Sequence, residues 1–266
     1  MSDVSSARFL GPGDPAPVET CRAAGRAPLL ITCDHASLKI PRALGDLGVP
    51  PAQLREHIGW DIGAAEVTRR LAARLDAAAL LTGFSRLVVD CNRHLDDESS
   101  IPAVSDGVPV PGNRDLSDAD RTTRIEALFH PYHRAIAARL EAFLAESVVP
   151  ALVSIHSFTP VMNGKARPWH VGILWDKDPR IAVPLLAALR CEASLIVGDN
   201  EPYSAREPVG YTMRQHGVGR GLPHVAIELR QDLVADAEGA AAWAERLASA
   251  LLPIIAAPEI HRVQHY

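Results

Sequence analysis

Three apolar stretches of the chain each lead to a side chain that can bind a metal ion or move a proton. The stretches cover residues 29–33, 152–155 and 224–227, and the side chains are those of His35, His156 and Glu228. A short apolar run that stops at polar residues is typical of a buried parallel strand, and open α/β folds place their sites where such strands end. One histidine alone is more often a hydrogen-bonded residue of the core. The repetition indicates a catalytic zinc site with an attendant carboxylate.

Asp61 is a candidate third metal ligand with a plain alternative role. It comes just before residues 64–75, where Val67, Leu71 and Leu75 recur at the spacing of one helix face. Aspartate is a favoured N-cap, and its charge suits the positive end of the helix dipole. From its position alone, the N-cap interpretation is favoured over metal ligation.

Asn92 and Arg93 lie at the end of a further predicted strand. A guanidinium matches a carboxylate in geometry and Asn adds a donor, so the pair suits an acidic substrate. Arg93 suits equally well an ion pair with Asp90 or with the acidic residues 96–98, and both interpretations stay open. The segment 95–116 that follows is polar and rich in Pro and Gly, and long irregular loops of this kind often serve as lids or rims.

Other histidines and aromatic side chains are assigned to packing or to the surface. His130 and His133 belong to a predicted half-exposed helix, where such residues usually pack or face solvent, so they are left out of the metal site. Tyr203 and Tyr211 can each reach over a site as a phenolic donor, but a half-buried tyrosine more commonly packs its ring.

Length and composition set the broad class. The 266 residues fit one large α/β domain, and 47% of them are hydrophobic, enough for a sizeable core. A net charge of -5 without a basic run gives no electrostatic footprint for nucleic acid. Four widely spaced cysteines without a C-x-x-C pair argue against a disulfide framework or a thiolate zinc cluster and favour a reducing cytoplasm. With no export signal and no apolar run long enough to span a bilayer, we expect a soluble intracellular protein, of an oligomeric state that the sequence does not indicate.

Strands alternate with helices along the chain, without an internal repeat. We expect strands at residues 29–33, 80–82, 87–90, 152–155, 169–175 and 224–227. We expect helices at residues 51–56, 64–75, 118–146, 179–191 and 237–252, with Pro131 kinking or splitting the third of them. Residues 1–26 are expected to be irregular. The predicted fold class is α/β, a single domain over residues 1–266 with a mixed, mostly parallel twisted sheet and helices on both faces.

Several motifs occur in a fixed order between Leu29 and the last helix. They are Cys33-Asp34-His35-Ala36-Ser37, Trp60-Asp61-Ile62-Gly63, Ser85 to Arg93, Ser154 to Phe158, Gly210-Tyr211-Thr212 and Ile227 to Asp232. Together they resemble the N-formylglutamate amidohydrolase family, which is related to the zinc carboxypeptidases. The resemblance implies their phosphorylase/hydrolase-like fold, a mixed twisted sheet between helices with one catalytic zinc.

The resemblance also implies which residues hold the metal. Zinc would be bound by His35, His156 and an acidic residue. Asp61 matches the family's recurring aspartate best, which reverses the preference for a helix cap. Asp34 ranks second, because many family members have proline at this place.

The same resemblance implies roles in substrate binding. Asn92-Arg93 is similar to the Asn-Arg pair with which carboxypeptidases grip a substrate carboxylate. Arg86 would lie near the scissile carbonyl. Tyr211, Thr212 and Arg230 belong to matching motifs and are expected to contact the substrate.

A mechanism follows from this placement of charges. Zinc with three protein ligands keeps a position open for water and polarises the amide carbonyl. Glu228 is the candidate general base, which takes the proton of the water and passes it to the leaving nitrogen. Arg86 would stabilise the oxyanion. The expected activity is hydrolysis of the N-formyl amide of an acidic amino acid such as N-formylglutamate.

The substrate and the class of protein have alternatives. Asp34 stands where the best-matched family members have proline, and the surroundings of Asp61 differ from their usual pattern, so another N-acyl amino acid or acidic amide is the alternative substrate. A serine hydrolase is disfavoured, because the chain lacks a G-x-S-x-G elbow. A non-catalytic carboxylate-binding protein of the same fold would keep Arg93 and dispense with the metal ligands.

Overall fold

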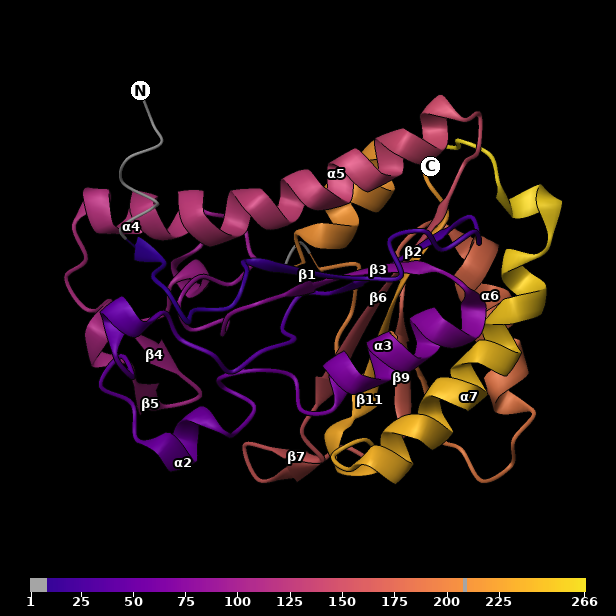
Figure 1. The fold of residues 1–266 in the computed structure, drawn as a ribbon. Helices are drawn as coiled ribbons and strands as arrows, with labels where there is room; N and C mark the ends of the chain where they lie inside the picture. Colours follow the sequence, from indigo (N-terminus) through magenta and orange to yellow (C-terminus); the bar gives the residue numbers. More distant parts are fainter. Residues whose placement is uncertain (1–8, 208–209) are drawn as a thin grey trace.

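The computed structural model describes residues 9–207 and 210–266. A seven-stranded sheet runs through the middle of the protein (Figure 1). Its strands, in spatial order, are β1 (Val18–Cys21), β3 (Ala78–Thr82), β2 (Leu29–Cys33), β6 (Ala151–Phe158), β11 (His224–Arg230), β9 (Val171–Leu174) and β10 (Val197–Asp199). The four central strands are parallel, and antiparallel pairing occurs between β1 and β3 and between β11 and β9. The sheet is therefore mixed and mostly parallel, as predicted.

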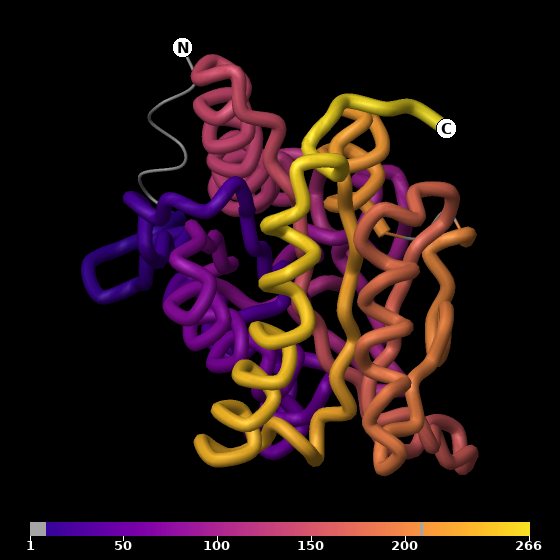
Figure 2. Tube along the Cα trace, turned by 90° about the vertical axis from the view of Figure 1, so that its right-hand side faces the viewer, coloured from indigo at the N-terminus to yellow at the C-terminus, as the bar shows by residue number. Residues whose placement is uncertain are grey.

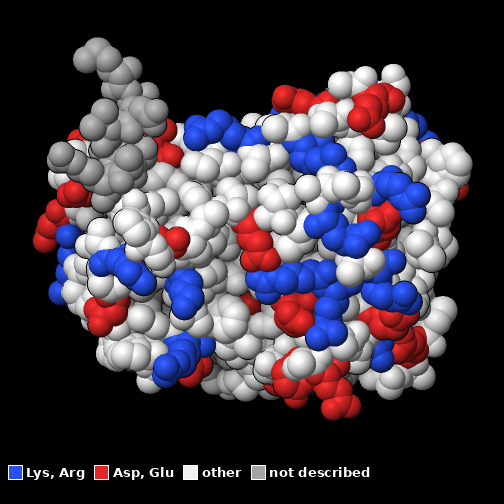
Figure 3. All heavy atoms as spheres, viewed as in Figure 1, with Lys and Arg blue, Asp and Glu red and all other residues white. Residues whose placement is uncertain are grey.

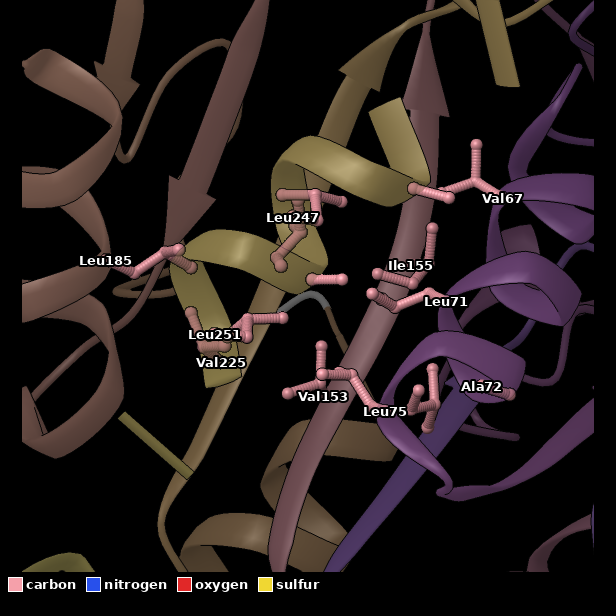
Figure 4. Close-up of a cluster of buried hydrophobic side chains, with 14 of the residues drawn as sticks. Val67, Leu71, Ala72, Leu75, Val153, Ile155, Leu185, Val225, Leu247 and Leu251 are labelled. Carbon is pink, nitrogen blue, oxygen red and sulfur yellow. The ribbon is translucent and has the colours of Figure 1, made fainter. Parts of the chain in front are cut away.

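Three helices cover one face of the sheet. They are α3 (Ala64–Leu75), α6 (Pro179–Arg190) and α7 (Ala237–Ile255), and α7 lies between the other two (Figure 2). Leu71 of α3, Leu247 of α7 and Val153 of β6 are fully buried in this layer (Figure 4). Full burial of one such side chain contributes about 1.5–3 kcal/mol. This packing fixes α3, and with it the loop that precedes the helix.

A second helical layer covers the other face. It consists of α4 (Asp118–Arg124), a π-helical turn at Ile125–Phe129 and α5 (His130–Ala145), which form the long rod along the top of Figure 1. Ser117 caps α4, because its hydroxyl accepts a hydrogen bond from the N–H of Asp120. The helix predicted for residues 118–146 is split by the π-helical turn. Pro131 then falls in the first turn of α5, where its missing N–H costs little.

Shorter elements lie around the sheet. They are α2 (Pro51–Leu54), the hairpin of β4 (Val104–Ser105) and β5 (Val108–Pro109), the hairpin of β7 (Val161–Met162) and β8 (Lys165–Ala166), a π-helical turn at Met213–Gly217, and 3-10 turns at Arg42–Leu44, Glu98–Ser100, Pro111–Asn113, Val218–Arg220, Gln231–Leu233 and Pro258–Ile260. In the β4–β5 hairpin the two turn residues, Asp106 and Gly107, both have positive φ. Such tight two-residue turns match the twist of the strands that they join.

Two predicted features are wrong. Residues 87–90 form no strand, since Leu87 and Val88 lie in a turn and residues 89–90 have no regular secondary structure. Their carbonyls are satisfied by side chains, since Leu87 O accepts from Asn113 Nδ2 at 2.8 Å and Val88 O accepts from Arg124 Nη1 at 3.3 Å. Part of the segment expected to be irregular, Val18–Cys21, forms the edge strand β1. The first eight residues of that segment lie outside the described residues.

The surface and the helices give two further observations. On the face shown in Figure 3, basic and acidic side chains are interspersed. Ion pairs also join neighbouring helices, such as that of Arg74 of α3 with Glu245 of α7, whose Nη2 and Oε1 atoms lie 2.6 Å apart. Among the helices of residues 9–207 and 210–266, none is both long and apolar enough to cross a membrane.

Candidate active site

His35, Asp61 and His156 converge at the carboxyl end of the sheet. His35 follows β2 by two residues, Asp61 lies in the loop before α3, and His156 is part of β6. All three are buried, and each offers one ligand atom within 4.8 Å of the other two. The structure thus brings together the three residues predicted as metal ligands.

Each of the two imidazoles has a carboxylate on both sides. Asp61 Oδ2 lies 3.3 Å from His35 Nδ1 and 2.9 Å from His156 Nδ1. On the far sides, His35 Nε2 lies 2.7 Å from Asp90 Oδ1, and His156 Nε2 lies 3.1 Å from Asp34 Oδ2. Metal-binding histidines typically donate their second N–H to a carboxylate, which fixes the ring and its tautomer. The two Nδ1 atoms and Asp61 Oδ2 are therefore the ligand set that this arrangement can offer to one ion.

Asp34, the other candidate acidic ligand, lies on the side of His156 that faces away from Asp61. Its Oδ1 accepts hydrogen bonds from the hydroxyls of Tyr132 and Thr212, both at 2.8 Å, and its Oδ2 accepts one from Ser154 at 3.2 Å. Burial opposes its charge, but the contact with His156 holds the pKa of Asp34 at about 2. The geometry favours Asp61 as the acidic ligand and Asp34 as the residue that orients His156.

The N-cap interpretation of Asp61 is wrong. The N-cap of α3 is Gly63, which makes no side-chain capping bond. Gly63 has a φ of +81°, and a Cβ at this position would lie 2.1 Å from the carbonyl oxygen of Val234, so the turn requires glycine. Asp61, two residues earlier, has its carboxylate directed to the histidines.

Arg86 links the two carboxylates on either side of His35. Its Nε and Nη2 lie 3.1 and 2.8 Å from Asp90 Oδ2, and its Nη1 lies 3.5 Å from Asp61 Oδ1. Burial disfavours the charge on Asp90, but Arg86 and His35 hold the pKa of this carboxyl well below its usual range. Asp90, considered from the sequence as a partner of Arg93, is thus the partner of Arg86.

Glu228 lies beside His156 on the neighbouring strand. The two residues are register partners in the parallel pair β11 and β6. Glu228 is buried, and its Oε2 has no hydrogen-bond partner within residues 9–207 and 210–266. Burial raises the pKa of Glu228 to about 7, against the opposing effect of His156. A carboxyl with a pKa near neutrality can both take up and release a proton, as a general base and acid must.

These residues line one cavity of about 460 Å³. Its wall includes the three candidate ligands together with Arg86, Asn92, Arg93 and Glu228. The segment 95–116 contributes Pro102 and the tip of the β4–β5 hairpin, so it forms part of the rim as predicted. Whether it moves as a lid stays a prediction.

Asn92 and Arg93 occupy the cavity wall in different ways. Asn92 Oδ1 accepts hydrogen bonds from the backbone N–H groups of Tyr211 and Thr212, at 2.9 and 3.0 Å, which fixes its amide. Arg93 donates from Nη1 to the carbonyl oxygen of Asn92 at 3.0 Å and forms no ion pair with any other described residue. Its guanidinium is therefore available to an acidic ligand.

Tyr211, Thr212 and Arg230 do not line this cavity, so their prediction as substrate-binding residues is not supported. The ring of Tyr211 packs against His133, with ring centroids 4.7 Å apart. Thr212 is fully buried behind Asp34. Arg230 pairs with Asp232 at 2.8 Å.

The cavity wall also contains two residues that are not among the predicted site residues. Tyr203, for which ring packing is the interpretation favoured from the sequence, lines the cavity, and its hydroxyl oxygen accepts a hydrogen bond from Arg167 at 3.1 Å. His57 was missed altogether. Its Nδ1 lies 3.9 Å from Asp61 Oδ1, and burial lowers the pKa of His57 to about 4, so the imidazole is neutral. The spacing of four residues between His57 and Asp61 was the signal available in the sequence.

The chain matches the sequence model of one protein family, described as N-formylglutamate amidohydrolase, over residues 27–235. Two curated relatives are both N-formylglutamate deformylases. The protein from Pseudomonas aeruginosa is 28% identical over 248 residues, which cover 87% of this chain and 91% of that protein. The protein from Pseudomonas putida is 28% identical over 226 residues, which cover 78% of this chain and 81% of that protein.

Two solved structures have a fold similar to that of this chain. The gene product Atu2144 from Agrobacterium tumefaciens is 37% identical and superposes with a TM-score of 0.91 over 95% of this chain and 100% of that chain. The N-formylglutamate amidohydrolase from Ralstonia eutropha JMP134 is 20% identical, with a TM-score of 0.67 over 92% of this chain and 99% of that chain. At that identity the second likeness concerns the fold alone.

Proposed function

The chain belongs to the N-formylglutamate amidohydrolase family, and from this premise we propose that it is a zinc-dependent amidohydrolase that cleaves the N-formyl amide of an acidic amino acid such as N-formylglutamate. The curated relatives that it matches are N-formylglutamate deformylases. The observation that carries the proposal is the convergence of His35, Asp61 and His156 beside Glu228 in one cavity.

The donor set of the site fits zinc. Two imidazole nitrogens and one carboxylate oxygen are ligands that catalytic zinc commonly takes, and three protein ligands leave a position for water or substrate. The carboxylates of Asp34 and Asp90 on the far nitrogens supply the outer contacts typical of such sites. When bound, the ion supplies Lewis acidity that polarises the amide carbonyl and acidifies water.

The residues of the chain supply the remaining chemistry. Glu228 takes the proton of the attacking water and then gives it to the leaving nitrogen, for which a pKa near neutrality is suited. Arg86, fixed by Asp90, carries a positive charge at the cavity wall and stabilises the oxyanion that forms from the carbonyl.

Asn92 and Arg93 hold the acidic part of the substrate. Arg93 offers a guanidinium without a carboxylate partner among the described residues, and its fork matches a carboxylate. Binding energy at this end of the substrate fixes the position of the scissile bond at the other end.

Replacement of Arg93 tests this binding role. A carboxylate paired with a guanidinium contributes about 1.5–3 kcal/mol, so R93A should raise the KM for N-formyl-L-glutamate about 10-fold to 100-fold and change kcat less. R246A is the matched control, because Arg246 pairs with Glu192 and does not line the cavity. Steady-state kinetics of both variants measure the effect. An unchanged KM in R93A would show that Arg93 does not bind the substrate carboxylate.

A non-catalytic carboxylate-binding protein is the second candidate. Such a protein would need Arg93 but no metal ligands. In the structure, however, three buried candidate ligands lie together, and Asp34 and Asp90 contact the far nitrogens of the two histidines. Metal analysis of purified protein separates the two. About one zinc per chain supports the hydrolase, and a metal-free chain from zinc-supplemented cells supports the binder.

The activity itself is tested by a substrate screen. Purified protein is assayed on N-formyl and N-acetyl derivatives of Glu and Asp and on N-formyl derivatives of neutral amino acids, with and without a chelator. We expect N-formyl-L-glutamate to be the best substrate and the chelator to abolish turnover. Turnover of none of these compounds by zinc-loaded protein would overturn the proposal.

The cytoplasm is the expected location of this activity. The expectation rests on the four cysteines, which are widely spaced in the sequence and form no C-x-x-C pair. Fractionation of the native host tests this expectation.

A further inference from the structure

His57 is a buried cavity residue that has no role in the mechanism above. It lies in the turn between α2 and Asp61, and only 9% of its surface is exposed. The turn is braced from two sides, since Ser85 Oγ donates to Gly59 O at 2.7 Å and Trp60 Nε1 donates to Arg55 O at 3.2 Å. The imidazole is therefore held in a fixed position at the cavity wall.

Neither ring nitrogen of His57 has a conventional hydrogen bond to another described residue. Nδ1 is fully removed from solvent and has no partner within 3.5 Å. A buried polar atom without a partner costs about 1–3 kcal/mol, which a purely structural residue would avoid. An apolar side chain of similar shape would fill this place at a lower cost, so the imidazole is of use to something that enters the cavity.

The surroundings indicate which nitrogen faces a ligand. Nδ1 is directed to Asp61, whose Oδ1 lies 3.9 Å away. A carboxylate favours the tautomer with the proton on the nearer nitrogen, so Nδ1 carries the hydrogen. The other nitrogen, Nε2, has no hydrogen bond to a described residue and, unlike Nδ1, is not fully enclosed. Because His57 lines the cavity, the lone pair of Nε2 can accept a hydrogen bond from a ligand there.

A secondary amide needs such an acceptor. It presents a carbonyl oxygen and an N–H, and Arg86 can serve only the oxygen. Asp61 Oδ2 is assigned to the metal and Asp61 Oδ1 faces Arg86 Nη1 at 3.5 Å. Asp90 accepts from His35 and Arg86, and Glu228 is occupied with proton transfer. His57 Nε2 is an acceptor that these assignments leave free, on a residue that lines the cavity and contacts Asp61 through its other nitrogen.

We propose that His57 is a substrate-positioning residue whose Nε2 accepts a hydrogen bond from the N–H of the scissile amide. The inference rests on the proposed function and adds to it a selection for secondary amides over esters. The contact would orient the amide plane before attack and would leave the metal site itself unchanged.

The test compares two replacements of His57 on two substrates. H57F keeps a flat ring and removes both nitrogens, and H57Q restores an acceptor near the position of Nε2. The substrates are N-formyl-L-glutamate and its formate ester analogue, in which oxygen replaces the N–H, assayed at neutral pH with spontaneous hydrolysis subtracted. We expect H57F to lose about tenfold in kcat/KM on the amide, the size of one hydrogen bond, and less than about twofold on the ester.

Three further readouts separate positioning from a structural or metal-binding role. H57Q should recover most of the activity on the amide. H57F should keep its zinc content, and its melting temperature should not fall, because the replacement removes a buried atom without a partner. Equal losses on amide and ester, no recovery in H57Q, or loss of zinc in H57F would each overturn the inference. Failure of the wild type on both substrates would overturn the proposed function and the inference with it.

Discussion

Within residues 9–207 and 210–266, two pairs of buried histidines have neighbouring rings, and one of these pairs belongs to a candidate metal site. In the pair of His35 and His156 the ring centroids are 5.2 Å apart, and in the pair of His133 and His216 they are 5.3 Å apart. All four side chains are buried. Burial and spacing are thus nearly the same in both pairs.

The pairs differ in what surrounds them. Burial acts to lower the pKa of each of these four imidazoles, but Asp34 and Asp61 outweigh it at His156 and raise the pKa of His156 well above the ordinary value. Around the second pair burial prevails, so the pKa of His133 falls to about 4 and that of His216 to about 3. Carboxylates, rather than histidines, therefore decide which pair attracts a cation.

The second pair has its own structural role. His133 Nδ1 lies 3.0 Å from His216 Nε2, and His133 Nε2 lies 2.8 Å from the carbonyl oxygen of Cys91. These contacts tie α5 to the π-helical turn at 213–217 and to the residue before Asn92. His133, assigned from the sequence to packing or to the surface, is buried and packs against Phe129.

Removal of one histidine of the first pair should have the largest effect. H156A lacks one of three ligands, so it should lose bound zinc and fall in kcat by about 10⁴-fold or more. Elemental analysis and the deformylation assay measure both. Full zinc content in H156A would show that His156 is not a zinc ligand. The two histidine pairs would then not differ in metal binding.

Replacement of the neighbouring base should come next. E228Q keeps the three ligands but cannot move a proton, so it should retain zinc and lose about 10²-fold to 10⁴-fold in kcat. A variant with normal turnover would remove Glu228 from the mechanism.

The pH profile is the companion measurement. A raised pKa means that the carboxylate needed as base is lost as the pH falls, so kcat/KM of the wild type should drop below pH about 7. A bound cation favours the charged carboxylate, so it would shift this acidic fall in kcat/KM to lower pH. The residual activity of E228Q should not show this fall.

A smaller effect is expected from the carboxylate behind His156. D34N keeps the shape of the side chain but weakens its hold on the imidazole, so zinc affinity should fall about 10-fold to 100-fold. Competition with a chelator measures the affinity. Unchanged affinity would show that the outer carboxylate is not what separates the two pairs.

The smallest effect on activity belongs to the second pair. H216F breaks the bond to His133, so the free energy of unfolding should fall by about 1–2 kcal/mol. Zinc content and kcat should stay within about twofold of the wild type. Loss of zinc in H216F would mean that the two pairs are coupled.

Much of the framework could be predicted from the sequence. The helix at residues 64–75 has the predicted bounds, because its buried residues recur at helical spacing over three turns. The positions of His35 and His156 followed from apolar runs that end in polar residues, and both strands exist. The spacing of apolar residues and the ends of apolar runs are local features, so they can be recognised in a single sequence.

The failures concern features that depend on the tertiary structure. Residues 87–90 are as apolar as a buried strand, but side chains of Asn113 and Arg124 bind their carbonyls, which no local pattern reveals. Thr212 belongs to a matching motif, yet its hydroxyl faces Asp34 rather than the cavity. The direction of a side chain and the partner of an acid such as Asp90 are set by contacts between distant segments.

The pairing of β6 with β11 has a consequence for how this site can change over evolution. His156 and Glu228 are opposite each other across a hydrogen-bonded ladder, so their separation takes discrete values. An insertion of one residue in either strand would turn one of the two side chains to the opposite face of the sheet. New substrate preferences should therefore arise in the surrounding loops, such as the β4–β5 hairpin, while the spacing between ligand and base is inherited unaltered.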